Sequence, residues 1–553
     1  MKKLLALILS MVTVFSLFAC GKKPEGKNLK TKDSKTEAPK PEDSKPEDSK
    51  PEVSKPEDSK PEDSDDDPAK RTDTAVVVGD RKISTAELTY FYIDGINNWY
   101  SQYGSYASYI GLNPSIGLEQ QFYDEELEMT WADFFLEQAV ESAKNVYALC
   151  DAAEKENFKL SAQEQANVAT LYDNLNTMAE NSKKSVTAFL QEIYGNGSDE
   201  QTYKKYYQDT VLASAYYSHH AEELKNSYTS TDLREFEKDA PYQYNSYTYA
   251  SFYLPLDAFK LGGTKDEKGN ITYSEEEVND AKEYLERFKD QLSARDIDTV
   301  EKLNGAIAKM EDEWYAIKGE PAAAEHSTAT ENTKMLYSMV SSVVQEWLRD
   351  ESRKNGDITA IAYKGDGDEL KGYYIVLFQQ CHDNYHPLAN VRHILVAFEG
   401  GNYNNLTGMP TYSDAEKKKA KDEADKLLKE WKDGAATEDS FAALANKHSD
   451  DGDGTTGGLY EDVYPGQMVT NFNNWCFSEG RKASDSGIVE TEYGYHVMFY
   501  SGDSTQSYRD YMVTNDKLTE EMNAWQEDLL DSVTVEEKNL DSIDKDLVLS
   551  SGN

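Results

Sequence analysis

Basic residues, cysteines and long apolar runs are all scarce in this chain of 553 residues. Lys and Arg number 58 against 102 Asp and Glu, so the formal net charge is −44. Phosphate backbones and anionic lipid surfaces attract positive charge. This balance therefore argues against nucleic acid as a partner and against a surface patch for anionic lipid.

The chain has only four cysteines, at positions 20, 150, 381 and 476. If Cys20 is modified, the other three cannot all pair, and we expect Cys150, Cys381 and Cys476 to be mostly buried small residues. The scattered histidines, including His219 and His220, lack metal-ligand spacing. We therefore expect neither a metal site nor a cofactor.

The N-terminus carries the one pronounced apolar run. Lys2 and Lys3 precede the apolar segment 4–18, which is too short to span a bilayer comfortably and ends in Ala19 and Cys20. This looks like a bacterial lipoprotein signal over residues 1–19, with Cys20 as the lipidated first residue of the mature protein. Two or more acyl chains would anchor it stably. A simple secretory signal cut at Ala19 is the alternative.

Residues 20–73 consist of the lipid-attachment residue and a Lys-Pro-Glu-Asp-Ser repeat tract. Repeated proline and alternating charge cannot bury a core, so we expect an extended, solvated spacer. At about 3.1 Å per residue it could reach on the order of 100 to 150 Å. That length suits a protein on the outer face of a membrane that works within or beyond a cell wall, as on a Gram-positive bacterium.

The C-terminal quarter contains an ordered series of short motifs. They are VRHILV at 391–396, SDD at 449–451, Gly457-Gly458, GQMVTNF at 466–472 and YGYHV at 493–497. The apolar runs around His393 and His496 predict strands, so a sheet can bring the two rings together. Ser413 and Glu416 form a capping box that opens a helix, which Gly434 ends.

This series resembles the parvulin family of peptidyl-prolyl isomerases over residues 390–501. The resemblance implies a small antiparallel sheet flanked by helices and catalysis of cis/trans exchange at X-Pro bonds. That exchange crosses a barrier of roughly 18 to 20 kcal/mol. It requires no nucleophile, metal or cofactor, only stabilisation of the twisted amide.

By the same resemblance, His393, Asp451, His496 and Thr491 form the polar catalytic cluster. Met468, Phe472 and Val469 form the proline socket, and Met468 and Phe472 lie four apart, which places them on one face of a predicted short helix. Asp451 stands where other parvulins carry Cys or Asp, which speaks against a thiolate mechanism. The alternatives are ordinary core packing for Met468 and Phe472, and satisfied core histidines.

Phosphate-directed parvulins carry basic residues just after the first strand. Residues 397–414 here contain no Lys or Arg. We therefore expect ordinary X-Pro substrates. Glu461 and Val463 replace the family's usual glycine and aromatic residue after the glycine pair, which leaves the shape of the socket wall open.

The region between spacer and isomerase begins with VVVGDRKIS at 76–84, which predicts a hairpin and then a helix capped by Ser84 with Glu87. This opening resembles the helical chaperone domain of SurA-type and PrsA-type foldases, here at residues 74–240. The tyrosine-rich stretch 89–111 is either a surface for unfolded chains or helix packing. We expect the C-terminal segment 505–553 to be helical and to complete this domain.

An internal repeat adds a further domain. Residues 347–357 align without gaps on 475–485 and share Trp, Glu, Arg, Lys and Asp, and both copies run into a strand, from Gly372 and from Gly494. We interpret residues 245–381 as a degenerate parvulin-like domain in which Tyr374 replaces the second histidine. An unrelated α+β insert is the alternative.

The sequence thus predicts an α+β protein, a lipid-anchored isomerase and foldase that assists unfolded or newly exported polypeptides. A holdase that binds chains on a parvulin scaffold without turnover is the second hypothesis. A solute-binding lipoprotein shares the anchor, but the motif series leaves it little room.

Overall fold

Two compact units make up the described part of the chain. The computed structural model describes residues 73–545 except 196, 267, 405–408 and 453. The expected signal, Cys20 and the spacer up to residue 72 lie outside the described residues. One unit ends at Ser227 and resumes at Glu520, and the other spans Tyr228–Thr519. Within the described ranges, none of the helices combines the length and apolar character that a membrane span requires.

The first unit is helical, with a three-stranded sheet. The Gly-Asp hairpin is confirmed as β1 (Thr74–Val78) and β2 (Arg81–Ser84), and β17 (Val535–Glu537) pairs antiparallel with β1. The side chain of Ser84 accepts from the amide of Glu87 and so caps α2, as predicted. The remaining elements are α2 (Thr85–Tyr103), β3 (Phe122–Asp124), β4 (Met129–Thr130), α3 (Trp131–Lys155), α4 (Ala162–Asn181), α5 (Val186–Tyr194) and α6 (Glu200–Ser227), with 3-10 turns at Gly104–Ile110, Leu118–Gln120 and Leu540–Ser542.

The tyrosine-rich stretch divides between core and surface. Tyr90 and Tyr92 are fully buried in the core of the first unit, whereas Tyr106 and Tyr109 are exposed. The packing interpretation therefore holds for the buried tyrosines, and a surface for unfolded chains stays a prediction for the exposed ones. The cysteines also divide: Cys150 and Cys476 are buried as expected, but Cys381 is exposed, because it lies near the end of a strand that extends beyond its core.

The second unit contains two four-stranded antiparallel sheets of the same design. The first sheet domain, residues 246–382, has the strand order β8-β5-β10-β9, and the second sheet domain, residues 387–507, has the order β14-β11-β16-β15. The strands of the first are β5 (Ser246–Pro255), β8 (Thr330–Leu336), β9 (Ile358–Lys364) and β10 (Leu370–His382). Those of the second are β11 (Pro387–Ala397), β14 (Leu459–Val463), β15 (Ser486–Glu490) and β16 (Gly494–Ser507).

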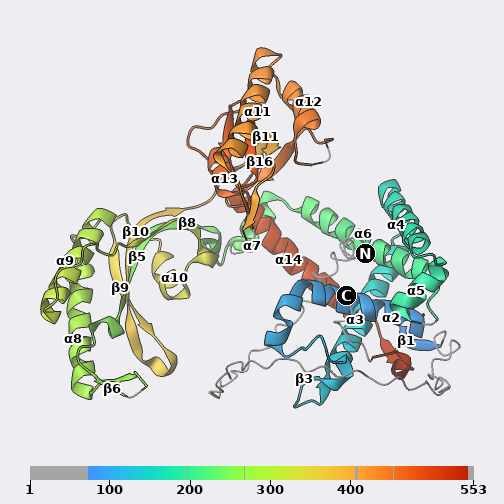
Figure 1. The fold of residues 1–553 in the computed structure, drawn as a ribbon, viewed down its shortest axis with the longest axis horizontal. Coiled ribbons are helices and arrows are strands. Elements are labelled where there is room, and N and C mark those ends of the chain that lie inside the picture. The colour runs from blue at the N-terminus through green and yellow to red at the C-terminus, as the bar shows by residue number, and fades with distance from the viewer. Residues whose placement is uncertain (1–72, 196, 267, 405–408, 453, 546–553) are drawn as a thin grey trace, which may run out of the picture. The chain divides into compact units, whose positions relative to one another are not determined.

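Each sheet is covered by helices on both faces. In the first sheet domain α8 (Glu275–Leu292) and α9 (Val300–Lys318) cover one face and α10 (Ser342–Leu348) the other, as Figure 1 shows. In the second, α11 (Asp414–Asp433) and α12 (Glu438–His448) cover one face and α13 (Thr470–Cys476) the other. The capping boxes of Ser274 with Glu277 and of Ser413 with Glu416 are both present. A small hairpin precedes α8, made of β6 (Thr264–Lys265) and β7 (Ile271–Thr272), and another precedes α11, made of β12 (Asn402–Asn404) and β13 (Met409–Thr411).

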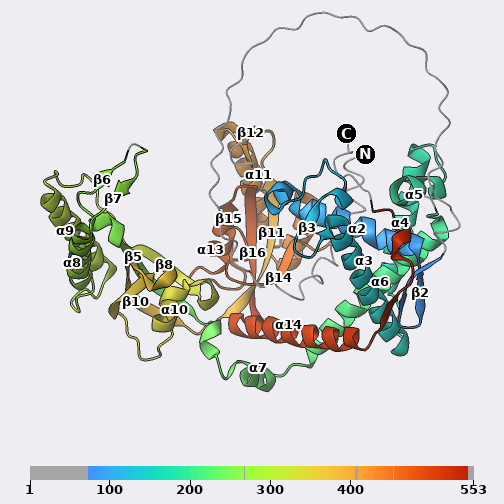
Figure 2. The same ribbon diagram turned by 90° about the horizontal axis from the view of Figure 1, so that it is seen from below.

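Helices and small antiparallel sheets together confirm the α+β class. One boundary was wrong: the chain does not become helical at 505, because β16 remains paired with β11 as far as Ser507. The helix α14 (Tyr508–Asp531) follows directly. Its first part packs against α7 (Ser230–Glu237) through Val513 and Leu233, and Figure 2 shows the two helices side by side.

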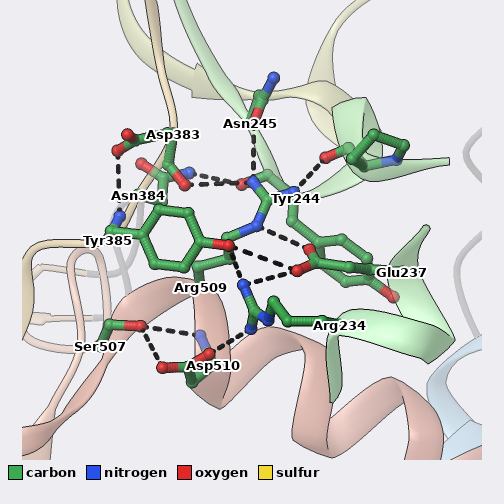
Figure 3. A network of polar contacts seen from close by, with 11 residues as sticks. Arg234, Glu237, Tyr244, Asn245, Asp383, Asn384, Tyr385, Ser507, Arg509 and Asp510 are labelled. Atoms are coloured by element: carbon green, nitrogen blue, oxygen red, sulfur yellow. Dashed lines mark hydrogen bonds and ion pairs between the residues drawn. The ribbon is translucent and has the colours of Figure 1, made fainter. Parts of the chain in front are cut away.

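The second unit also has a polar junction, where the chain enters and leaves the two sheet domains (Figure 3). Arg509 at the start of α14 donates to Glu237 at 2.6 Å, to the side chain of Asn245 at 2.8 Å and to the carbonyls of Asp383 and Pro241. Both charged side chains of the Arg509–Glu237 pair are about 95% buried (4% and 5% exposed).

Candidate active site

The sheet register brings the two histidines of the motif series together. His393 on β11 pairs with Met498, and His496 on β16 pairs with Leu395, so the two rings are diagonal neighbours on one face. Their Nδ1 atoms are 3.0 Å apart, and the rings stack with centroids 5.2 Å apart. His393 is 2% exposed and His496 5%. The predicted pairing of these histidines by a sheet is confirmed.

The SDD motif is held against β11 by its own polar groups. The Ser449 hydroxyl accepts from the amide of Leu395 at 3.1 Å, and the amide of Asp450 donates to the carbonyl of Leu395 at 2.9 Å. The carboxylate of Asp450 accepts from the amide of Ala397 at 2.9 Å. These contacts place the next residue, Asp451, with Oδ2 3.2 Å from Nε2 of His393.

Thr491 completes the polar cluster from the turn between β15 and β16. Its amide donates to the carbonyl of Gly494 at 2.9 Å, and its Oγ1 lies 2.9 Å from Nε2 of His496. The side chain is 6% exposed. The structure therefore brings all four residues of the expected polar cluster into one connected set.

The donors and acceptors of this set determine the histidine tautomers, since each neutral imidazole carries a single N–H. An ionised Asp451 only accepts, so His393 directs the hydrogen of Nε2 toward it and leaves Nδ1 as an acceptor. His496 then carries its hydrogen on Nδ1, and its Nε2 accepts from the Thr491 hydroxyl. The result is a one-way series of polar contacts from Thr491 to Asp451.

Burial keeps both imidazoles neutral. It lowers the pKa of His393 and that of His496, the latter to about 4, and the mutual proximity of the two rings also lowers the pKa of His496. The nearby Asp451 carboxylate opposes these shifts without overcoming them. At neutral pH the cluster therefore carries its negative charge at Asp451, whose side chain is 40% exposed.

The glycine pair of the motif series lets β14 approach β11 closely. The amide of His393 donates to the carbonyl of Gly458 at 2.9 Å. A Cβ atom on Gly458 would lie 2.1 Å from the carbonyl oxygen of His393, and Gly458 has φ +65°. Only glycine fits here, so this residue helps to set the position of His393.

The apolar side of the site is centred on Phe472. Its side chain is 2% exposed, and its ring meets those of His393 and His496 edge-on, at centroid distances of 5.5 and 5.4 Å. Met468 and Val469 are partly buried and pack against the same cluster.

The prediction that Met468 and Phe472 share a helix is wrong. The helix α13 begins at Thr470, and Val469 is its N-cap with extended backbone (ψ 147°). A turn in which the amide of Gln467 donates to the carbonyl of Tyr464 precedes it. Met468 therefore lies on the connection into the helix, although it reaches the same cluster.

Sequence reasoning missed Tyr460. This residue of β14 donates its hydroxyl to Oδ2 of Asp451 at 2.7 Å, and its ring stacks on that of His393 with centroids 4.8 Å apart. Its only sequence signal is its position two residues after Gly458. Val463, at the place of the family's usual aromatic residue, is buried in the core.

The first sheet domain carries no such cluster at the corresponding positions. Gly372 pairs with Pro255 as Gly494 pairs with Ala397, so Ser251 corresponds to His393 and Tyr374 to His496. Tyr253, Tyr363 and Tyr374 contact one another there, with centroid distances of 4.8 to 5.8 Å. Among the residues that the structure describes, no group of three His, Cys, Asp or Glu side chains is arranged to hold a metal ion.

Comparison with known families agrees with this site. Residues 373–501 match the family model of the PPIC-type PPIase domain, a match that begins within β10 and covers the whole polar cluster. This part of the chain is therefore a parvulin-type peptidyl-prolyl isomerase domain, as the motif series predicts.

Solved structures similar to the chain include three PrsA proteins. They are the peptidylprolyl isomerases PrsA from Bacillus anthracis (21% identity, 27% of this chain and 59% of that chain) and Bacillus cereus (23%, 31% and 59%), and PrsA from Bacillus subtilis (22%, 28% and 54%), each with a TM-score of 0.17. The alignments span less than two thirds of each PrsA chain. No curated protein matches the chain.

Proposed function

We propose that this chain is an active peptidyl-prolyl cis/trans isomerase and foldase, and that residues 390–501 carry the chemistry. The observation that supports this most strongly is the buried series from Thr491 through His496 and His393 to Asp451, which lies against the ring of Phe472. A set of this kind orients a single carboxylate beside an apolar surface.

The geometry suggests how the site would lower the barrier to rotation about the X-Pro bond. A planar amide places negative charge on its carbonyl oxygen, and this charge decreases when the bond twists. With the proline ring against Phe472, Met468 and Val469, the Asp451 carboxylate would oppose the charge of the planar form and so favour the twisted one. His393, His496 and Thr491 would hold that carboxylate in place, since their hydrogens are used within the series.

Turnover by residues 21–553, the chain without its signal and without Cys20, tests the proposal. We expect it to accelerate isomerisation of a proline tetrapeptide, and the double variant His393→Ala, Asp451→Ala to lose most of this rate. Equal rates for wild type and double variant would contradict the proposal. A Thr-Pro peptide should serve at least as well as its phosphorylated form, because residues 397–414 supply no basic group.

A holdase activity is the second candidate, and the first sheet domain favours it. This domain shares the strand order of the second but has Ser251 and Tyr374 at the histidine positions. We interpret it as a diverged parvulin-like domain that binds polypeptide without isomerising it. If the chain protects an unfolded protein from aggregation and shows no turnover, the holdase hypothesis is correct.

We further propose that Cys20 is lipidated and anchors the protein to the outer face of a Gram-positive cell membrane, with unfolded exported polypeptides as partners. The support is the sequence around Cys20 and the spacer behind it. Labelled palmitate should enter the wild-type protein and not a Cys20→Ala variant. Release of unlabelled protein cut after Ala19 would instead indicate a simple secretory signal.

A further inference from the structure

Tyr460 lies where the polar series meets the apolar side of the candidate site. It comes from β14, an edge strand of the second sheet, at the position paired with Val391. Its hydroxyl contacts Asp451, its ring face contacts His393 at 29° to that ring, and its centroid is 6.4 Å from that of Phe472. One side chain thus touches the carboxylate, the imidazole and the socket.

The Asp451 carboxylate depends on such contacts because it is half-exposed and belongs to a loop. Tyr460 donates to its Oδ2 at 2.7 Å, and Nε2 of His393 lies 3.2 Å from the same oxygen. Among the described residues, both side-chain contacts of this carboxylate fall on Oδ2, which leaves Oδ1 for a substrate. A hydrogen bond to a charged group is stronger than one between neutral groups, so Tyr460 restricts the carboxylate effectively.

We propose that Tyr460 is a positioning and specificity-determining residue of the isomerase site. Its hydroxyl fixes Asp451 toward the X-Pro bond, and its ring forms the socket wall between His393 and Phe472. This inference rests on the proposed isomerase function. It also accounts for the socket wall that the sequence left open. Val463, at the place of the family's usual aromatic residue, is buried in the core, and Tyr460 supplies an aromatic ring three residues earlier.

The environment of Tyr460 keeps its hydroxyl protonated, and therefore a hydrogen-bond donor, between pH 5 and 9. The following charged and titratable groups surround it. They are Asp451 on its loop, His393 on β11 and, behind His393, His496 on β16, while Glu461 and Asp462 on β14 itself are exposed. Burial and the bond to Asp451 raise the pKa of Tyr460 to about 12. Without this hydroxyl, the Asp451 carboxylate keeps only its contact with His393, so its position should be less restricted.

Three variants of residues 21–553 separate the hydroxyl from the ring. Tyr460→Phe removes the hydroxyl and keeps the ring, and Tyr460→Leu removes both but remains apolar. The matched control is Tyr495→Phe, because Tyr495 also donates to a carboxylate, that of Glu490 at 2.8 Å, but is exposed at that contact and outside the site. For each variant, kcat and KM for a proline tetrapeptide are measured from pH 5 to 9.

We expect Tyr460→Phe to lower kcat roughly tenfold with little change in KM, since one charge-assisted hydrogen bond is lost. Tyr460→Leu should show the same loss in kcat and a raised KM that depends on the residue before proline. The Tyr495→Phe control should match wild type. A Tyr460→Phe variant with the wild-type kcat would overturn the proposal.

A second measurement needs no turnover and so distinguishes this proposal from the proposed function. The imidazole nitrogen resonances of His393 report its tautomer and its contact with Asp451. Tyr460→Phe should shift them, and Tyr495→Phe should not. Unchanged resonances in Tyr460→Phe would refute the positioning role even if wild type lacks isomerase activity, whereas inactive wild type with shifted resonances would refute only the isomerase function.

Discussion

At the scale of single residues, the candidate site depends on two neutral imidazoles whose contacts acid can disrupt. His393 and His496 are buried as neutral imidazoles, each satisfied by the other and by one further side chain. Protonation of His393 would place a second hydrogen on Nδ1, where it would face the N–H of His496. The stability of the second sheet domain and its proposed activity should therefore depend on pH through the same residues.

The lowered pKa of His496 determines whether the stability of the domain rises or falls with pH. The folded-state value of about 4 lies below the ordinary 6.5, so between these values the unfolded chain binds a proton that the folded chain excludes. Stability should fall as pH decreases through this window, by up to about 3 kcal/mol from this residue, and be unaffected above it. His393 acts in the same direction.

Urea unfolding at pH 7.5 and 4.5 checks this expectation in wild type and in His496→Asn. The variant should lose less stability on acidification than wild type does. His326→Gln is the control, because this histidine is exposed and outside the site. Equal acid sensitivity of wild type and His496→Asn would contradict the assignment of neutral buried imidazoles.

Two buried phenylalanines, one on each face of the second sheet, provide a test of the proline socket and its matched control. Phe472 and Phe441 are both buried, on opposite faces of the sheet. A change to leucine preserves most of the apolar volume, so each variant should lose about 1 kcal/mol of stability. Only Phe472→Leu should reduce isomerase activity, by roughly tenfold, because only that ring contacts both histidines. Equal activity of the two variants would remove Phe472 from the socket.

Sequence patterns predicted the histidine pair because each histidine stands in a strand-like run with its own motif. They could not predict Tyr460, since a single tyrosine in a five-residue strand has no periodicity, and only the register of β14 on β11 places it over His393. They misplaced Met468 because a spacing of four is typical of a helix. Met468 instead lies between the turn at 464–467 and the start of the helix at Thr470, so its spacing of four from Phe472 does not come from helical backbone.

At the scale of elements, the internal repeat extends to matching contacts. Arg353 donates to the carbonyl of Trp347 at 3.0 Å and lies over its ring, and Arg481 does the same to Trp475 at 2.9 Å. In each copy an aspartate carboxylate accepts from the backbone amide three residues before it, Asp357 from Lys354 and Asp485 from Lys482. The sequence repeat was visible because these residues form the same structure twice.

The other differences between the predicted and observed elements lie at element ends, where a strand or helix extends beyond the residues that show its sequence pattern. The sequence SFYLPL predicts a strand from Ser251, and the pattern at 299–310 predicts a helix, but the strand begins at Ser246 and the helix continues to Lys318. In both cases the chain continues to bury one face, so tertiary packing extends the element beyond its local signal. The three-residue strand β17 has too little sequence of its own to be predicted.

Glycine substitutions can test the close approach of β14 to β11. Gly458→Ala places a Cβ against the carbonyl of His393, whereas Gly466→Ala meets no atom within 4 Å although its φ is +90°. Both variants bear the left-handed backbone strain of about 1 to 2 kcal/mol, and Gly458→Ala should lose at least about 2 kcal/mol more. Isomerase activity should fall in Gly458→Ala and remain in Gly466→Ala. Similar unfolding midpoints for the two would contradict the close approach.

At the scale of the second unit, the junction around Arg509 joins three crossings of the chain. Asn245 lies just before the first sheet domain, Asp383 lies between the two domains, and Arg509 lies just after the second. Asn384 strengthens the same junction, since its side chain donates to the carbonyl of Tyr244 at 2.9 Å and its carbonyl accepts from the amide of Arg509 at 2.8 Å. One buried guanidinium thus fixes the segments on which both sheets begin and end (Figure 3).

This arrangement predicts an unequal response to single and double substitution. Arg509→Met removes one of the two guanidinium partners of the buried Glu237 carboxylate and leaves only Arg234, and breaking a buried pair from one side typically destabilises by about 3 to 5 kcal/mol. The double variant Arg509→Met, Glu237→Met removes both charges and should recover part of that loss. Arg349→Met is the control, because its pair with Glu346 is screened by solvent and should contribute little to stability.

Urea unfolding and limited proteolysis measure the two consequences. In Arg509→Met the unfolding midpoint should fall and the connection at 383–386 should become accessible to protease, because the carbonyl of Asp383 loses its donor. The double variant should lie between Arg509→Met and wild type on both measurements. If the double variant is the least stable, the guanidinium's bonds to Asn245, Asp383 and Pro241, rather than its charge pair with Glu237, determine the stability of the junction.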